Sequence, residues 1–170
     1  RARFHTQWEA AQLTWDKYQT EHGVTPAPTV TPFPLPPITT PGPRGTAIAG
    51  DLGVEVVVTA VNPDGWSVIK AESSSNDAPK SGNKYILVTV RVVNRGSERI
   101  WVDASQFSIY ANGTSYEEGE QDNPNDFEAK QLGPDESTGG NLSFEAPSPV
   151  STASQTVLLY LLGDVVMALQ

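Results

Sequence analysis

The chain has 170 residues, of which 20 are acidic and 11 basic, so its formal net charge at pH 7 is −9. This charge argues against electrostatic binding of DNA, RNA or an anionic membrane surface, because such binding needs clustered lysine and arginine. The sequence has no cysteine, which excludes disulfide scaffolds, cysteine-ligated zinc and thiol catalysis. No stretch reaches 18 uninterrupted apolar residues, so no segment of the sequence reads as a membrane-spanning helix.

Residues 1–23 are predicted to form an amphipathic helix, because the first proline comes later and Gly23 follows as a C-cap. Large side chains recur from Phe4 to His22 with alternating spacings of four and three residues, which is the rhythm of a heptad. A lone helix with so much aromatic surface is expected to dock on another subunit, on the chain's own C-terminal domain or on a membrane surface. The candidate partner-binding residues of this stripe are Phe4, Trp8, Trp15 and Tyr18.

Residues 24–45 are predicted to form an extended linker rich in proline and threonine. Many of the 14 prolines lie between Pro26 and Pro43, so this segment is expected to run as polyproline II. It is either an unmodified spacer or a cell-surface stalk whose threonines carry glycans. Because the sequence opens on Arg1 rather than methionine, a signal peptide or a membrane anchor is expected upstream.

Residues 46–170 are predicted to form an antiparallel β-sandwich. Their apolar residues recur with period two, and turn signals such as Asn112-Gly113, typical of a type I′ hairpin, separate the runs. Seven or eight short strands without helical periodicity between them favour a sandwich of the immunoglobulin-like kind over a closed barrel. The residues expected to share a face are Val54, Val56, Val58 and Ala60 in one strand, and Ile86, Val88, Val90 and Val92 in the clearest one.

The stretch from Gly82 to Pro147 combines turns and core positions in a recognisable order. A long strand ends in an Asn turn, an aromatic strand leads to a Gly hairpin and a tyrosine, and a Leu-x-Pro-x-Glu turn precedes a strand that closes in Phe-Glu-x-Pro. The residues are Gly82, Asn94, Phe107, Gly113, Tyr116, Leu132, Pro134, Glu136, Phe144 and Pro147. This pattern resembles the bacterial immunoprotective-antigen-like family of immunoglobulin-like extracellular domains, whose function is unknown. The resemblance implies a secreted or membrane-anchored domain and brings no catalytic residues with it.

The sequence predicts neither an enzyme nor a cofactor. Hydrolytic triads and most general-base schemes need a histidine, and the two histidines, His5 and His22, both fall in the predicted N-terminal helix. They stand near opposite ends of that helix and so cannot bind one ion together. No phosphate-binding glycine loop, dinucleotide fingerprint or zinc-protease motif is present.

The acidic run from Glu117 to Glu128 contains no basic residue and is expected to be a solvated loop. Calcium takes six to eight oxygens from flexible loops, so a weak calcium site is the alternative interpretation. Its candidate ligands are Asp122, Asp126 and Glu128.

The C-terminal segment from Val157 is apolar on both faces, unlike a strand with one solvated face. Leaving one such face in water would forgo several kcal/mol, at roughly 1.5 kcal/mol per large aliphatic side chain. The outer face is therefore expected to be covered by a partner subunit or by the chain's own linker, where Phe33, Leu35 and Ile38 are suited to the contact. The outer-face residues are Val157, Leu159 and Leu161.

Together these patterns predict a non-enzymatic extracellular interaction module, an accessory or structural subunit of a cell-envelope or membrane-associated assembly. Its expected partners are protein subunits or further copies of itself, with no nucleic acid, and with a membrane only through a segment upstream of Arg1. One alternative is a free-standing ligand- or calcium-binding domain displayed on a stalk. The other is a self-assembling surface-filament or coat subunit.

Overall fold

The structure, a computed structural model, describes residues 42–50, 52–119, 121–150, 156–160 and 165–169. The chain divides into two units, and all of these residues belong to the second, Thr39–Gln170. The predicted helix at residues 1–23 and most of the predicted linker lie outside the described residues. No helix in the described part of the chain is long and apolar enough to cross a membrane.

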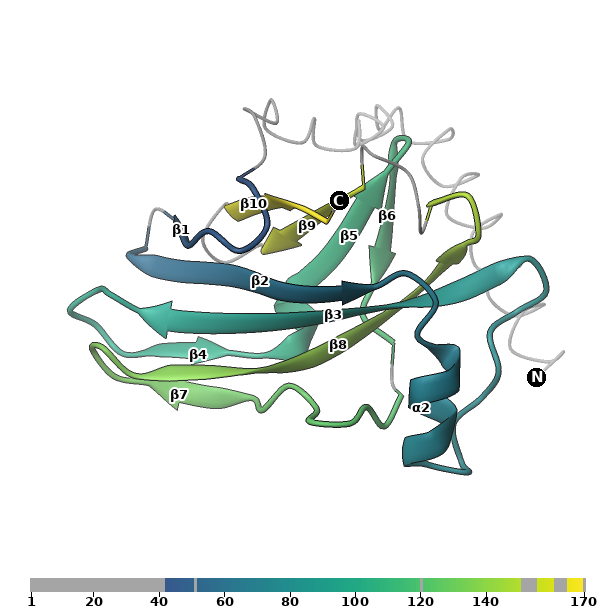
Figure 1. Ribbon diagram of the computed structural model, residues 1–170. Coiled ribbons are helices and arrows are strands. Elements are labelled where there is room, and N and C mark those ends of the chain that lie inside the picture. The colour runs from purple at the N-terminus through teal and green to yellow at the C-terminus, as the bar shows by residue number, and fades with distance from the viewer. Residues whose placement is uncertain (1–41, 51, 120, 151–155, 161–164, 170) are drawn as a thin grey trace, which may run out of the picture. The chain divides into compact units, whose positions relative to one another are not determined.

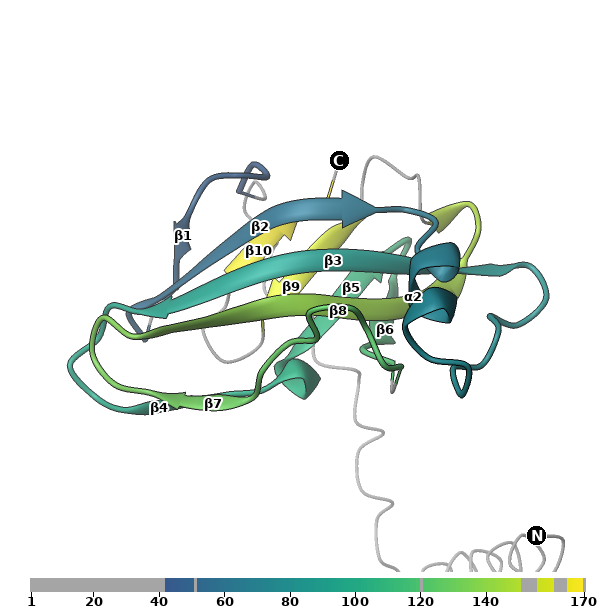
Figure 2. The ribbon, with the colours of Figure 1, turned by 60° about the horizontal axis from the view of Figure 1, so that its bottom comes forward.

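The described strands form two four-stranded antiparallel sheets and one small two-stranded sheet, which confirms the predicted β-sandwich (Figures 1 and 2). The first sheet has the order β1 (Ile48–Ala49), β2 (Val54–Asn62), β3 (Asn83–Asn94), β8 (Ser137–Pro147). The second has the order β10 (Val165–Ala168), β9 (Val157–Tyr160), β5 (Phe107–Ala111), β6 (Thr114–Glu117). The small sheet pairs β4 (Ile100–Val102) with β7 (Lys130–Leu132). A 3-10 turn, η1 (Ala104–Gln106), precedes β5.

Single bridges join the two large sheets at both edges. Gly42 pairs with Met167 of β10, and a few residues later Ile48 pairs with Val56 of β2, so this segment passes from one sheet to the other. At the opposite edge, Glu118, directly after β6, pairs with Phe144 of β8. At these positions the edge strands β10 and β8 are paired within the chain. The bridges are isolated contacts, so the architecture is a sandwich with linked edges rather than a closed barrel.

The core lies between the two large sheets and contains the inward-facing residues of each strand. These side chains are 2% exposed or less: Val54, Val56, Val58, Ile86, Val88, Val90, Val92, Phe107, Ile109, Leu142, Phe144, Leu158 and Tyr160. The predicted alternation is thus confirmed for β3 and for the first half of β2. It is wrong for Ala60, because the register of β2 shifts between Val58 and Ala60, which leaves Ala60 exposed and turns Val61 toward the core.

The sequence predicted no helix inside the sandwich, and this is wrong. Helix α2 (Trp66–Glu72) follows the turn at residues 62–65 and packs on the outer face of β3 (Figure 1). Ile69 is fully buried there against Tyr85 and Leu87, and the rings of Trp66 and Tyr85 lie 5.9 Å apart. The helix has only seven residues, which is too short for a 3.6-residue period to emerge from the sequence.

Asn94, the last residue of β3, is fully buried and joins three separate segments. Its Nδ2 donates to the carbonyls of Glu98 at 2.7 Å and Leu132 at 3.1 Å, and its Oδ1 accepts from the Gly96 amide at 2.9 Å. Its backbone amide donates to the carbonyl of Glu136, and its own carbonyl accepts from the Asp135 amide. The ends of β3 and β7, the start of β8 and the loop toward β4 therefore depend on this one residue.

The predicted turns next to strand ends are present. At Asn112-Gly113 both residues have positive φ, 51° and 82°, as the type I′ hairpin between β5 and β6 requires. In the Gly133–Glu136 turn, Pro134 precedes Asp135 with φ 62°, and the Glu136 carboxylate accepts from the Gly133 amide at 2.8 Å. Proline followed by a residue with positive φ is the arrangement of a type II turn.

Glu145 on β8 anchors the turn that leads into β3. Its Oε1 accepts from the Lys80 amide and from Asn83 Nδ2, both at 2.8 Å. Burial by itself raises the pKa of this carboxyl, but the hydrogen bonds from Asn83 and Lys80 and the charge of Lys80 outweigh it. The pKa of Glu145 therefore lies below its ordinary value, and its ionised form stabilises the fold.

Replacing Asn94 with alanine (Asn94→Ala) is expected to lower the free energy of unfolding by about 3 kcal/mol, because the buried Leu132 carbonyl and two partly buried groups, the Glu98 carbonyl and the Gly96 amide, lose their partner. Urea unfolding at neutral pH measures this. The matched control is Ser97→Ala, an exposed residue of the same loop, which is expected to stay within about 0.5 kcal/mol of wild type. Equal effects of the two substitutions would contradict the role assigned to Asn94.

Replacing Glu145 with glutamine (Glu145→Gln) is expected to cost about 1 kcal/mol of stability at pH 7, since a charge-assisted acceptor becomes neutral. A lowered folded-state pKa stabilises the fold above the unfolded pKa and loses that effect as pH falls through the folded value. The difference between wild type and variant should therefore vanish in acid, which urea unfolding at a series of pH values measures. Glu72→Gln, at an exposed residue, serves as control. A difference that stays constant into acid would refute the assignment.

Candidate functional site

The outer face of the first sheet has three stretches along β3. At one end, Tyr85 and Leu87 lie under helix α2, and at the other, Arg95 follows directly after β3. Between them, around Thr89 and Arg91, a shallow groove of about 450 Å³ opens across β2, β3 and β8. It is lined by Thr59, Thr89, Val90, Arg91, Ser137, Thr138, Gly139 and Gly140. This groove is the candidate functional site.

Two glycines of β8 form part of the groove wall, and neither position has room for a side chain. A Cβ on Gly139 would lie 2.5 Å from the carbonyl oxygen of Val90, and one on Gly140 would lie 2.5 Å from that of Asp126. Contacts this short with backbone atoms cannot relax through side-chain motion. The packing of β8 against β3 and against the acidic loop therefore leaves this part of the outer face bare.

The hydroxyl groups of the groove differ in what they can still offer a ligand. Thr59 Oγ1 donates to the Thr89 carbonyl at 3.2 Å, and Thr89 Oγ1 bonds with Asn141 Oδ1 at 2.6 Å, so both of these protons are engaged. Ser137 Oγ, in contrast, accepts from Arg91 Nη2 at 3.5 Å and keeps its own proton. Arg91 and Ser137 thus form an adjacent pair of available donors.

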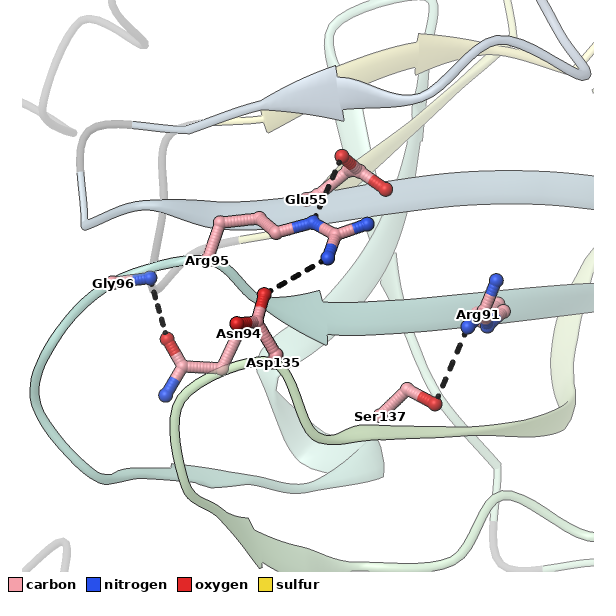
Figure 3. A network of polar contacts seen from close by, with 7 residues as sticks. All are labelled: Glu55, Arg91, Asn94, Arg95, Gly96, Asp135 and Ser137. Atoms are coloured by element: carbon pink, nitrogen blue, oxygen red, sulfur yellow. Dashed lines mark hydrogen bonds and ion pairs between the residues drawn. The ribbon is translucent and has the colours of Figure 1, made fainter.

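Two neighbouring arginines of the same region are in different surroundings (Figure 3). Arg95 lies between two carboxylates, with Nη1 at 3.0 Å from Asp135 and Nε at 3.4 Å from Glu55. The hydrogen bonds to Asp135 and Glu55 raise the pKa of Arg95. Among the described residues, the Arg91 side chain has one polar contact, its hydrogen bond to the Ser137 hydroxyl, and it is exposed to solvent.

The three predicted calcium ligands are not brought together. Asp122 is tied to Asn76, whose Nδ2 donates to its carbonyl and whose Oδ1 accepts from its amide, both at 2.9 Å. Asp126 Oδ1 accepts from Asn123 Nδ2, and the Glu128 carbonyl accepts from Thr138 Oγ1. Within the described ranges, no group of three or more His, Cys, Asp or Glu is placed to hold a metal ion. Calcium binding by this loop stays a prediction.

The predicted partner-binding residues have separate outcomes. The aromatic stripe from Phe4 to Tyr18 and the β9-flanking Leu161 lie outside the described residues. Val157 and Leu159 face away from the core yet are only 5% and 7% exposed, in a chain without a partner present. A partner therefore reaches these two side chains only if whatever covers them moves aside, and their role as partner contacts stays a prediction.

Arg91 and the groove around it were not among the residues singled out from the sequence. Two features of the sequence mark this region. Arg91 is a lone charge within the apolar run from Ile86 to Val93, and Gly139-Gly140 is a pair of glycines inside a strand, which is typical of a close backbone approach. Neither signal shows that the two lie side by side, because that depends on the pairing of β3 with β8.

A sequence model of a family described as a domain of unknown function, DUF4352, matches residues 47–159. None of the curated proteins compared matches this chain. Among solved structures, YcdA of Bacillus subtilis is 21% identical with a TM-score of 0.51, and the match covers 68% of this chain but only 33% of YcdA. YjhA of Bacillus subtilis is 16% identical with a TM-score of 0.49, and the match covers 70% of this chain and 79% of YjhA. The secreted protein MPT63 of Mycobacterium tuberculosis is 15% identical with a TM-score of 0.47, and the match covers 72% of this chain and 90% of MPT63.

The likeness to YcdA supports the fold and nothing further, because the identity is low and the match spans a third of that protein. The immunoprotective-antigen-like label drawn from the turn pattern is not the one that matches, and it is not confirmed. The family model, in contrast, covers most of the chain, from the residue before β1 to the third residue of β9. This protein belongs to the DUF4352 family.

Proposed function

We propose that this protein is a non-enzymatic extracellular interaction module that holds a group of its partner in the groove at Arg91. The partner is a protein subunit of a cell-envelope or membrane-associated assembly. The sandwich supplies a rigid support, and the ligand-contacting residues lie on paired strands rather than on loops.

The observation that carries this proposal is the groove itself. It is the stretch of the outer face that α2 leaves uncovered, it opens to solvent over a volume of about 450 Å³, and the Arg91 guanidinium in it forms no ion pair with the residues that the structure describes. Its lining consists of threonine, serine, valine, glycine and arginine, and it includes none of the residue types that usually serve as general acids or bases, such as histidine, aspartate and glutamate. Such a lining is suited to holding a group rather than to general acid–base chemistry.

The extracellular setting is supported by composition. A linker rich in proline and threonine directly before a sandwich is typical of cell-surface stalks. YcdA, which shares the fold, is provisionally described as a lipoprotein. The predicted aromatic helix at residues 1–23 would add a second contact to the same assembly.

Photo-crosslinking in the organism that makes the protein tests the proposal. A photoreactive amino acid is placed at Thr59, on the groove, or at Glu98, an exposed residue of the loop after β3 and outside the groove. Illumination of cells is expected to give a discrete adduct from position 59 and none from position 98. No adduct at position 59, or the same adducts from both positions, would contradict the proposal.

A further inference from the structure

Arg91 is a cation that the described part of the chain leaves without a carboxylate, although the protein carries a net charge of −9. The acidic residues on the neighbouring strand and turn, Glu55 and Asp135, are both bound by Arg95. Arg91 has the Ser137 hydroxyl instead, at 3.5 Å, which is the outer limit of a hydrogen bond. A ligand can therefore displace or share this contact at little cost.

The polar groups of the groove that remain available to a ligand are hydrogen-bond donors. A guanidinium has only donors, and Ser137, which accepts from Arg91, has a proton left to donate. The protons of Thr59 and Thr89 are engaged within the sheet. A group that pairs with Arg91 and Ser137 together must therefore be an acceptor of hydrogen bonds.

We infer, on the basis of the proposed function, that the groove binds a carboxylate whose oxygens accept hydrogen bonds from the Arg91 guanidinium and from the Ser137 hydroxyl. An ionised carboxylate only accepts hydrogen bonds, and it matches the planar fork of arginine. The carboxylate is that of an acidic side chain of the protein partner, and an acidic sugar is the other outcome that the test distinguishes. Both sources present the same group to Arg91.

The charge around the groove favours a carboxylate over a phosphate. A phosphate monoester carries close to two negative charges at neutral pH, whereas the groove supplies one positive charge. The β8 side of the groove approaches the acidic loop, where Asp126 packs its carbonyl on Gly140 and the Glu128 carbonyl binds Thr138. Asp126 and Glu128 are exposed residues of that loop, and any repulsion from their carboxylates is about twice as large for a dianion as for a monoanion, because the Coulomb energy is proportional to the charge.

Titration of the full-length, ¹⁵N-labelled protein tests this inference, with the amides of Gly139 and Gly140 and the Arg91 Nε–H as reporters. The probes are a glutamate-containing tripeptide with blocked ends, the same peptide with glutamine, glucuronate, glucose and inorganic phosphate. We expect saturable shifts of the reporters with at least one of the two carboxylate probes and none with its neutral counterpart. The tighter of the two carboxylate probes identifies the source of the group.

The variants Arg91→Gln and Arg91→Lys are expected to weaken the binding of the carboxylate probe roughly tenfold, because neither glutamine nor lysine has the planar, charged guanidinium of arginine. Arg91 is exposed, so both should keep the wild-type unfolding midpoint. The control Arg99→Gln removes an exposed charge from the loop outside the groove and should bind as wild type does. Equal losses in Arg91→Gln and Arg99→Gln would overturn the inference, since general charge attraction would then explain the binding.

Two further outcomes separate this inference from the proposed function. If the neutral probes shift the groove as much as the carboxylates, or if phosphate binds more tightly than both, the carboxylate inference is refuted while the groove remains a binding site. If the carboxylates bind as expected but the crosslinker at position 59 finds no partner in cells, the inference stands and the interaction module is refuted.

Discussion

One buried amide determines how the end of the sandwich is arranged. Asn94 has no exposed surface, and all three hydrogen bonds of its side chain go to backbone groups of other residues. The Leu132 carbonyl is buried and would be costly to leave unpaired, whereas the Glu98 carbonyl and the Gly96 amide are partly buried. Asparagine supplies two donors and an acceptor in one plane. The loop after β3 and the turn before β8 are consequently fixed relative to each other. No apolar residue of similar size could replace this set of bonds.

The ion pairs of Arg95 follow from that arrangement. Once Asn94 fixes the turn at Gly133–Glu136, Asp135 lies beside Arg95, and Glu55 on β2 completes the ion pairs (Figure 3). At the other end of β3, the Gly65 amide donates to the Tyr85 carbonyl and brings α2 onto the sheet. The outer face is thus closed at both ends by local interactions, and the groove is the part that neither covers.

The sequence was sufficient where a local pattern decides the structure. The alternation from Ile86 to Val92 predicts a strand and its buried face, and Asn112-Gly113 predicts a hairpin, because both depend on neighbouring residues only. The features it did not predict depend on contacts between distant residues. Helix α2 is stable because its Ile69 packs on Tyr85 and Leu87 of β3. The register shift between Val58 and Ala60 is a property of the pairing of β2 with β3. The groove likewise combines residues from three strands.

Folding alone does not account for Arg91. An exposed arginine with one long contact to a serine adds little stability, since even exposed ion pairs contribute about 0–1 kcal/mol. A threonine or valine at that position would suit a strand at least as well and would lose less side-chain entropy. Glu55 and Asp135 show that the same surface can provide carboxylates for an arginine, and it provides them to Arg95. Within the described residues, the fold uses the Arg91 side chain only through its bond to Ser137, and the proposed carboxylate contact builds on this observation.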